Sequence, residues 1–231
     1  MSEHQESILD PMTDYYGVFS DLTPDEREHW SKAHSLEGEI LECINELWEN
    51  ATYHIEIVEK MGKIGLFNDG LDIPGVQPVS PLAAGLVHME LARIDGSMAV
   101  AIGVQVALCM RAISNLGSEE QRNKYLPGLA TGELKGAFAM TEPDHGSDAV
   151  AMEATARRDG DDWIINGQKR WIGQGAIGDI TVVWARKEDD GKIAGFIVHQ
   201  DWEGYEAENI TGKVSLRAVP QALITLNNVR V

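Results

Sequence analysis

The sequence has 231 residues, of which 43% are hydrophobic, and a net charge of −18. A chain of this length buries roughly 70% of the surface that it exposes when unfolded, so one or two ordinary cores form without disulfide or metal staples. Residues 1–50 hold 13 acidic side chains against only Arg27 and Lys32, which predicts a solvated acidic helix face. Such a surface repels phosphate groups, so we expect no nucleic-acid binding and no binding to anionic membranes.

The cysteines and the most apolar stretch indicate the cellular location of the protein. Cys43 and Cys109 each lie in an apolar helical pattern, without a CxxC pair or a signal peptide, which predicts a reducing, cytoplasmic location. Met98 to Met110 is interrupted by Gly103 and Gln105 and is shorter than a membrane span, so it predicts a buried helix. The seven histidines show no metal-ligand spacing, and we expect no metal site.

The first helices are predicted from capping and periodicity. Thr23 to Glu26 has the residues of a capping box with proline at the first helical position, so a helix begins there. Leu36, Ile40, Ile44 and Leu47 then recur on one helical stripe, while glutamates fall elsewhere around the wheel. This pattern indicates an amphipathic helix with a wet acidic face.

Further helices follow along the chain. One is predicted from about His54, and it ends in a long loop over 65–81 that is rich in glycine and proline. Two more are expected at Pro81 to Ile94 and Ser97 to Leu116. A second capping box at Ser118 opens a helix that ends near Leu129.

After Glu133 the sequence changes to short β-branched and aromatic runs with Asp-Gly and Asn-Gly turn pairs. Asn166-Gly167 predicts a hairpin, because both central residues of a type I′ turn need positive φ. Ile180 to Arg186, Ile193 to His199 and Gln221 to Leu226 predict further strands of an antiparallel meander. The expected fold class is α+β. A helical domain over 1–136, with 1–20 poorly ordered, precedes an antiparallel, barrel-like β domain over 137–231.

The stretch from Gly136 to Asp148, reading GAFAMTEPDHGSD, is the most informative for function. A strand ends there in a polar loop in which Thr141, Gly146 and Ser147 offer N–H groups and hydroxyls to a flat heterocycle or a phosphate. An ordinary strand exit with local Thr and Ser turns explains the same residues equally well. The residues alone leave both interpretations open.

This stretch is similar to the T-E-P-x-x-G-S-D signature of the acyl-CoA dehydrogenase family. Three other stretches agree with the family in order and spacing: residues 117–127, 166–172 and 212–217. The wording Q-K-R-W-I-G is shared with glutaryl-CoA dehydrogenases and plant short-chain acyl-CoA oxidases. The resemblance covers nearly everything after about residue 55.

The resemblance implies an FAD site. Its strand would lie along the isoalloxazine ring, with a threonine hydroxyl on the pyrimidine edge. Its loop serine would reach the flavin phosphate and the thioester, and its Trp-Ile pair would cover the other flank of the ring. The cofactor-binding residues implied in this way are Phe138, Ala139, Met140, Thr141, Gly146, Ser147, Trp171, Ile172 and Gly173.

Two departures from the family narrow the expected chemistry. Most members read W-I-T-N where this chain has Gly173 and Gln174, so we expect open space near flavin N5 and easier access of oxygen. Glutaryl-CoA dehydrogenases carry an arginine for the distal carboxylate, where this chain has Ala99 followed by Val100. A buried carboxylate without a partner is costly, so a short or branched acyl-CoA is the expected substrate, contacted by Ala99, Val100 and Ser147.

The resemblance implies that the catalytic base is a glutamate in a C-terminal four-helix domain. Neither Glu133 nor Glu142 nor Glu153 occupies its place in the motif order, so no catalytic residue is expected in this chain, which would be an inactive fragment. The full-length enzyme is expected to be a homotetramer that passes electrons to an electron-transfer flavoprotein or to oxygen. The alternative is a non-catalytic flavin- or acyl-CoA-binding module.

Overall fold

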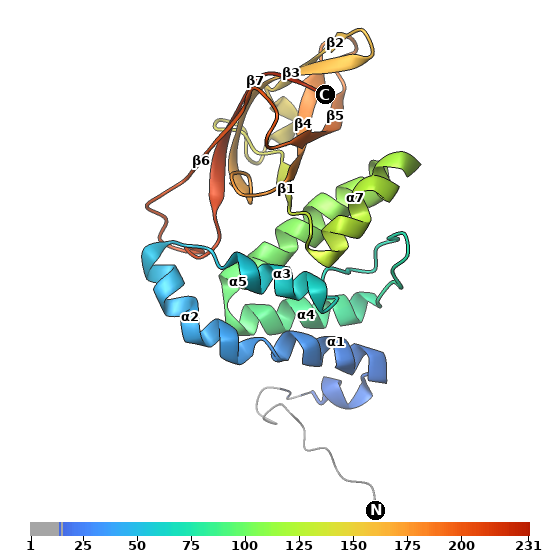
Figure 1. Ribbon diagram of the computed structural model, residues 1–231, viewed down its shortest axis with the longest axis vertical. Coiled ribbons are helices and arrows are strands. Elements are labelled where there is room, and N and C mark those ends of the chain that lie inside the picture. The colour runs from blue at the N-terminus through green and yellow to red at the C-terminus, as the bar shows by residue number, and fades with distance from the viewer. Residues whose placement is uncertain (1–13, 15) are drawn as a thin grey trace, which may run out of the picture.

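The computed structural model describes residue 14 and residues 16–231, and it places a helical half beside a half built of strands (Figure 1). The expectation of poor order over 1–20 falls mostly on residues 1–13 and 15, which lie outside the described residues. At the end of that range, Val18–Asp21 forms a short 3₁₀ helix, η1. The division into domains at residue 136 stays a prediction, although the helices end at Thr131 and the strands begin at Gly136.

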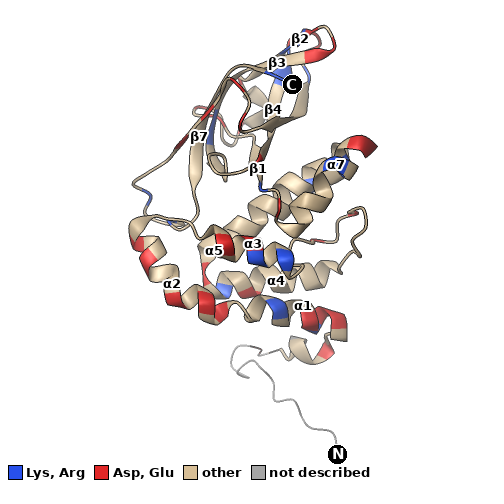
Figure 2. Ribbon diagram, in the orientation of Figure 1, with Lys and Arg blue, Asp and Glu red and all other residues tan. Residues whose placement is uncertain are grey.

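The predicted helices of the N-terminal half are confirmed. Both capping boxes form: the Thr23 hydroxyl accepts from the N–H of Glu26, and the Ser118 hydroxyl accepts from the N–H of Gln121. Figure 2 shows acidic residues along the first two helices, whose apolar stripe packs inward. The helices are α1 (Pro24–His34), α2 (Glu37–Asn50), α3 (Ile55–Lys63), α4 (Pro81–Ile94), α5 (Gly96–Ile102), α6 (Arg111–Leu116) and α7 (Glu119–Thr131).

One continuous helical rod runs from Gly96 to Leu116. It consists of α5, a π-helical segment labelled η2 (Gly103–Met110) and α6. Its bounds agree with the helix predicted from Ser97 to Leu116, and its 21 residues are long and apolar enough to cross a membrane by length and composition. However, 56% of its most apolar window is buried inside the protein, and a core helix passes the same test. The predicted burial of this stretch is confirmed.

The strands form one curled sheet that is mixed, not antiparallel. Its order is β1-β4-β2-β3-β7-β6, with β5 on β4, and both β1 and β2 run parallel to β4. The meander prediction failed here because alternation of apolar residues reveals a strand but not the direction of its partner. The strands are β1 (Gly136–Ala139), β2 (Thr155–Asp159), β3 (Asp162–Gly173), β4 (Ile180–Lys187), β5 (Ile193–His199), β6 (Tyr205–Asn209) and β7 (Gln221–Arg230).

The hairpin predicted at Asn166-Gly167 is wrong, because both residues lie inside β3. Gly167 has φ 142°, and a Cβ there would come within 2.7 Å of Ala154, so glycine permits a close backbone approach. A register shift against β7 between Ile165 and Gly167 marks a bulge. The turns at Asp159-Gly160 and Asp190-Gly191 do connect neighbouring antiparallel strands, as predicted.

Two buried or half-buried side chains join the helices to the sheet. Gln105 in η2 donates to the carbonyls of Leu129 (2.9 Å) and Leu134 (2.8 Å), and it accepts from the N–H of Gly136 (2.8 Å) at the start of β1. Arg217 donates from its Nε to the carbonyl of Trp48 at the end of α2 (2.7 Å). The helical core also includes apolar residues of β4, so the two halves share packing.

Candidate functional site

Two of the stretches that resemble the family motifs, residues 136–148 and 166–172, lie side by side. The chain leaving β1 passes the end of β3, where the N–H of Arg170 donates to the carbonyl of Thr141 (2.8 Å). One residue earlier on both segments, Nζ of Lys169 donates to the carbonyl of Met140 (3.1 Å). The fold therefore brings Met140 and Thr141 next to Trp171, although about 30 residues separate them in the sequence.

A second bulge in β3 turns Trp171 outward. Lys169 pairs with Ile224 and Ile172 with Ala222, so two residues of β3 stand opposite one of β7. Trp171 in this bulge has φ 65°, a conformation that an aromatic residue rarely adopts, and it remains 46% exposed. The guanidinium of Arg170 lies 5.2 Å from its ring centroid. Bulges of this kind re-aim a side chain next to binding sites.

A buried ion pair supports the junction from inside the sheet. Lys169 is fully buried and Glu142 is 5% exposed, and Nζ of Lys169 lies 2.8 Å from Oε1 of Glu142. The carboxylate also accepts from the N–H groups of Glu153 (2.6 Å) and Ala154 (3.0 Å). Burial raises the pKa of Glu142, but these hydrogen bonds outweigh it and hold the pKa below its usual value. Burial lowers the pKa of Lys169, and the pairing with Glu142 opposes that shift.

The loop after Glu142 presents free donors. The N–H of Glu142 donates to the carbonyl of His145 (3.0 Å), which closes a turn. Gly146 and Ser147 are exposed and form no hydrogen bond with any residue that the structure describes. Their N–H groups and the Ser147 hydroxyl are therefore available to an anionic or carbonyl oxygen.

The rod over residues 96–116 covers the end of β3. A Cβ on Gly173 would come within 2.6 Å of Cγ2 of Val104, so the space expected beside Gly173 is filled by that side chain. The expectation of an opening at this glycine was wrong, because the sequence does not reveal which helix residue packs against it. Ala99 and Val100 are half-buried on the same rod, and Val100 lies one turn before Val104, on the same face.

The remaining predicted residues differ in accessibility. Phe138 is half-buried, with its ring 5.8 Å from that of Trp184. Ala139 and Ile172 are buried in the core of the β half, so only their backbone atoms are available to a ligand. The structure thus presents Thr141, Gly146, Ser147 and Trp171 at the surface of one region and places Ile172 behind it.

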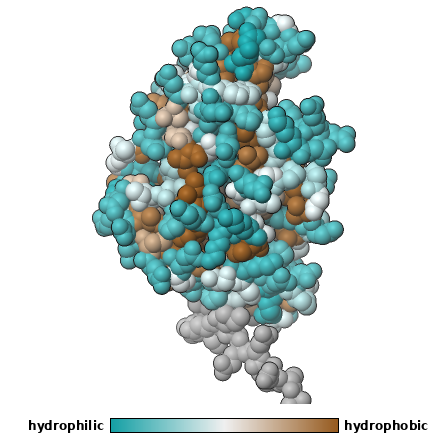
Figure 3. Space-filling model, viewed as in Figure 1, coloured by the Kyte–Doolittle hydropathy of each residue, from teal (hydrophilic) through white to brown (hydrophobic). Residues whose placement is uncertain are grey.

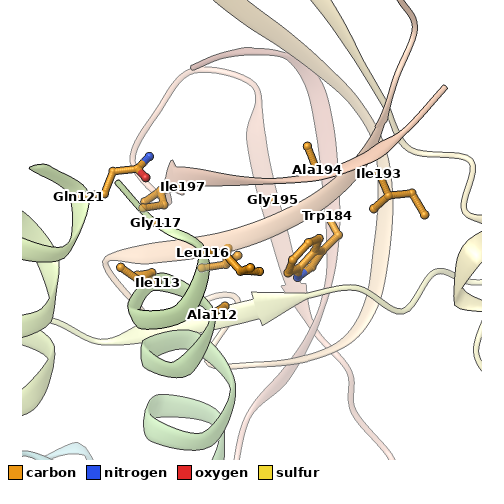
Figure 4. Close-up of a pocket in the computed structure, with 11 residues that line it drawn as sticks. Ala112, Ile113, Leu116, Gly117, Gln121, Trp184, Ile193, Ala194, Gly195 and Ile197 are labelled. Carbon is orange, nitrogen blue, oxygen red and sulfur yellow. The ribbon is translucent and has the colours of Figure 1, made fainter. Parts of the chain in front are cut away.

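A hollow of about 330 Å³ lies between the end of α6 and strands β4 and β5 (Figure 4). Leu116, Trp184 and Ile197 line it. A second hollow of about 270 Å³ shares Trp184 and includes Phe138 and Leu108. Figure 3 shows hydrophobic surface where the helical half meets the strands.

Sequence reasoning missed three buried polar residues: Gln105, Glu142 and Lys169. Lys169 stands between Gln168 and Arg170, so no apolar neighbours mark it as buried, and its partner Glu142 lies 27 positions away. Within residue 14 and residues 16–231, no group of three or more His, Cys, Asp or Glu side chains is arranged to hold a metal ion.

Comparison with known proteins places these motifs in one family. The model of the acyl-CoA dehydrogenase N-terminal domain matches residues 23–133, and that of the acyl-CoA dehydrogenase middle domain matches residues 137–229. Glutaryl-CoA dehydrogenase of Desulfococcus multivorans is 33% identical over 195 residues, which cover 80% of this chain and 49% of that protein. The short-chain-specific acyl-CoA dehydrogenase of Clostridium acetobutylicum is 32% identical, with coverage of 79% and 49%.

The fold comparison agrees. The crystal structure of a glutaryl-CoA dehydrogenase from Mycobacterium smegmatis in complex with FADH2 superposes with a TM-score of 0.88 at 37% identity, covering 94% of this chain and 56% of that one. The chain spans about half the length of the relatives it matches. By its motifs, its sheet and both domain models, the chain belongs to the acyl-CoA dehydrogenase family.

Proposed function

We propose that this chain is the flavin- and substrate-binding part of an FAD-dependent acyl-CoA dehydrogenase that desaturates the α,β bond of a short or branched acyl-CoA. The observation that carries the proposal is the junction of Thr141 with the Trp171 bulge, in a chain of this family. The similarity to an enzyme whose structure contains FADH2 supports the choice of cofactor.

The residues present fit FAD. Trp171 offers an exposed aromatic face held by a strained bulge, which suits a flat heterocycle. Thr141 offers a side chain at the same junction, and Gly146 with Ser147 offers donors that no described residue uses, which suits a phosphate or carbonyl oxygen. When bound, FAD accepts the hydride that leaves the β-carbon of the thioester. These residues of the chain bind and orient, and the backbone of Ala139, Ile172 and Gly173 completes the wall.

The proton-abstracting base is proposed to lie outside residues 1–231. Glu142 directly follows Thr141, but Lys169 and two backbone N–H groups hold it buried as a carboxylate, so it is not free to take up a substrate proton. Glu153 is exposed and faces His145. The 231 residues alone are therefore expected to bind ligands without turnover.

The substrate assignment rests on Ala99. Its side chain cannot pair with a distal carboxylate, so we propose a saturated short or branched acyl group even though relatives include glutaryl-CoA dehydrogenases. In the complete enzyme, Ala99→Arg is expected to raise kcat/KM for glutaryl-CoA relative to butyryl-CoA. An unchanged ratio would contradict the placement of Ala99 at the distal end of the substrate.

The electron acceptor is proposed to be an electron-transfer flavoprotein or oxygen, and the complete enzyme is proposed to be a cytoplasmic homotetramer. Peroxide release during turnover would identify oxygen, whereas reduction of electron-transfer flavoprotein without peroxide would identify the carrier. Because Val104 fills the space beside Gly173, the oxidase alternative gains no support from that glycine.

The competing function is a flavin- or acyl-CoA-binding module without catalysis. Titration of the purified chain with FAD, followed by Trp fluorescence and flavin absorbance, tests the binding that both functions share. The proposal predicts saturable FAD binding that Trp171→Ala weakens, whereas Trp48→Ala, a change of the same kind far along the chain, leaves it unchanged. Absence of FAD binding by the unchanged chain would refute the proposed function and the flavin-binding form of the alternative, and would leave only an acyl-CoA-binding module.

A further inference from the structure

The buried pair of Lys169 and Glu142 ties together three segments that the chain order separates. Nζ of Lys169, in β3, reaches Oε1 of Glu142 (2.8 Å) and the carbonyl of Met140 (3.1 Å). The same carboxylate accepts from the N–H groups of Glu153 (2.6 Å) and Ala154 (3.0 Å), just before β2. One ion pair therefore connects the chain leaving β1, the entry to β2 and the middle of β3.

Stability alone does not explain why an ion pair occupies this buried position. Two charges removed from water gain little net stability, and apolar side chains of similar size commonly replace such pairs without loss. A buried charge left alone is, by contrast, costly, so each partner depends on the other. Lys169 and Glu142 therefore specify an arrangement of segments more than they strengthen the fold.

The arrangement that they specify is the strained bulge. Lys169 is the last residue of β3 in register before the bulge, and Trp171 two residues later has φ 65°. Consecutive residues of β3 hold consecutive carbonyls of the other segment: Lys169 holds Met140 through its side chain, and Arg170 holds Thr141 through its N–H (2.8 Å). A non-glycine residue persists in the left-handed region only where its surroundings hold it there.

We propose that Lys169 and Glu142 are positioning residues that keep the Trp171 bulge against Met140 and Thr141 in the geometry that binds the flavin. Neither side chain contacts the flavin, because both are buried. Without the pair, Arg170 loses its fixed partner and Trp171 relaxes towards regular strand geometry. Only the part of this inference that concerns flavin binding rests on the proposed function.

The test compares Lys169→Met with Lys187→Met. Methionine fills a similar volume without charge, and Lys187 on β4 forms a more exposed pair with Asp190 (2.9 Å) that serves as the control. Circular dichroism reports the fold, hydrogen exchange reports the Arg170 amide, and FAD titration reports affinity. We expect Lys169→Met to keep the fold, to exchange the Arg170 amide about tenfold faster or more, and to bind FAD about tenfold more weakly. Lys187→Met should match the unchanged chain.

The outcomes separate the two proposals. Unaltered Arg170 exchange and FAD affinity in a folded Lys169→Met chain would overturn the positioning role, as would a loss of stability without a selective change at Arg170. If Lys169→Met does not fold, Glu142→Gln, which retains an acceptor oxygen for the backbone N–H groups, is judged by the same readouts. Loss of the fold in both variants would make the pair a folding requirement and overturn the proposal. Failure of the unchanged chain to bind FAD would refute the proposed function, while the exchange at Arg170 still decides the role of the pair.

Discussion

Glu90 on α4 is predicted to be the side chain on which the packing of the helical half depends most. It is fully buried and accepts hydrogen bonds from Nε1 of Trp30 (3.1 Å), from Nδ1 of His34 (2.8 Å) and from Nε of Arg93 (3.1 Å). The ring of His34 stacks on Trp30 at 4.9 Å, so one carboxylate organises the contact between α1 and α4. The substitution Glu90→Gln leaves these donors facing an amide instead of a carboxylate.

The expected cost of Glu90→Gln follows from these contacts. Breaking a buried pair by removing one charge costs about 3–5 kcal/mol, and the partial exposure of Arg93 reduces this to about 2–4 kcal/mol. For a chain of this length that corresponds to a fall in Tm of roughly 4–16 °C. Urea denaturation followed by Trp fluorescence measures it. The matched control is Glu28→Gln, because Glu28 forms an exposed pair with Lys32 (2.9 Å) that is expected to contribute little to stability.

Glu90 should also make the stability of the fold depend on pH. Burial raises the pKa of Glu90, but the hydrogen bonds from Arg93, His34 and Trp30 outweigh it, so its pKa lies below the usual value. A carboxyl with a depressed pKa in the folded state contributes stability above the unfolded value of about 4.3, and it loses that contribution as pH falls through the folded pKa. The stability gap between the unchanged chain and Glu90→Gln should therefore narrow on acidification. A variant as stable as the Glu28→Gln control, or a gap independent of pH, would refute this reasoning.

Three further substitutions test close contacts at the site and within the helical half. Gly173→Ala should lower the free energy of unfolding by about 1–3 kcal/mol, because its Cβ would come within 2.6 Å of Val104. Adding Val104→Ala should restore part of the lost stability. Equal stability of the single variant and the unchanged chain would contradict the contact. Arg217→Met should destabilise by about 1–2 kcal/mol and shift the fluorescence of Trp48, whose ring lies 4.9 Å from the guanidinium; an unchanged spectrum would count against this link. Gly62→Ala should prevent α3 from packing against the end of α7, where backbone atoms lie 2.6 Å from the added Cβ; an unaltered Tm would disprove that approach.

Local signals predicted the helical half well because capping and periodicity act within a few residues. The boxes at Thr23 and Ser118 mark where α1 and α7 begin, since the bonds that satisfy the first N–H groups come from neighbours in sequence. Asn166-Gly167 failed for the opposite reason. Its glycine is needed because the backbone there lies close to Ala154 on the neighbouring segment, and no local pattern in the sequence reveals that contact.

The candidate site was predicted through its motifs, but not through the residues that hold it. Thr141 and Trp171 lie in stretches that resemble the family, and the fold brings them together. The pairing of Lys169 with Glu142 joins residues 27 positions apart and depends on the mixed sheet, which alternation in the sequence does not specify. Tertiary pairing therefore had to come from the structure.

The central claim is that FAD lies along the segment from Phe138 to Thr141, the loop at Gly146 and Ser147, and the Trp171 bulge. Hydrogen exchange of the chain with and without FAD, resolved to single amides, tests it most directly. We expect FAD to protect the amides of Gly146, Ser147 and the Trp171 bulge and to leave those of α1 and α2 unchanged. Saturable binding of FAD with protection confined to another part of the chain would contradict it.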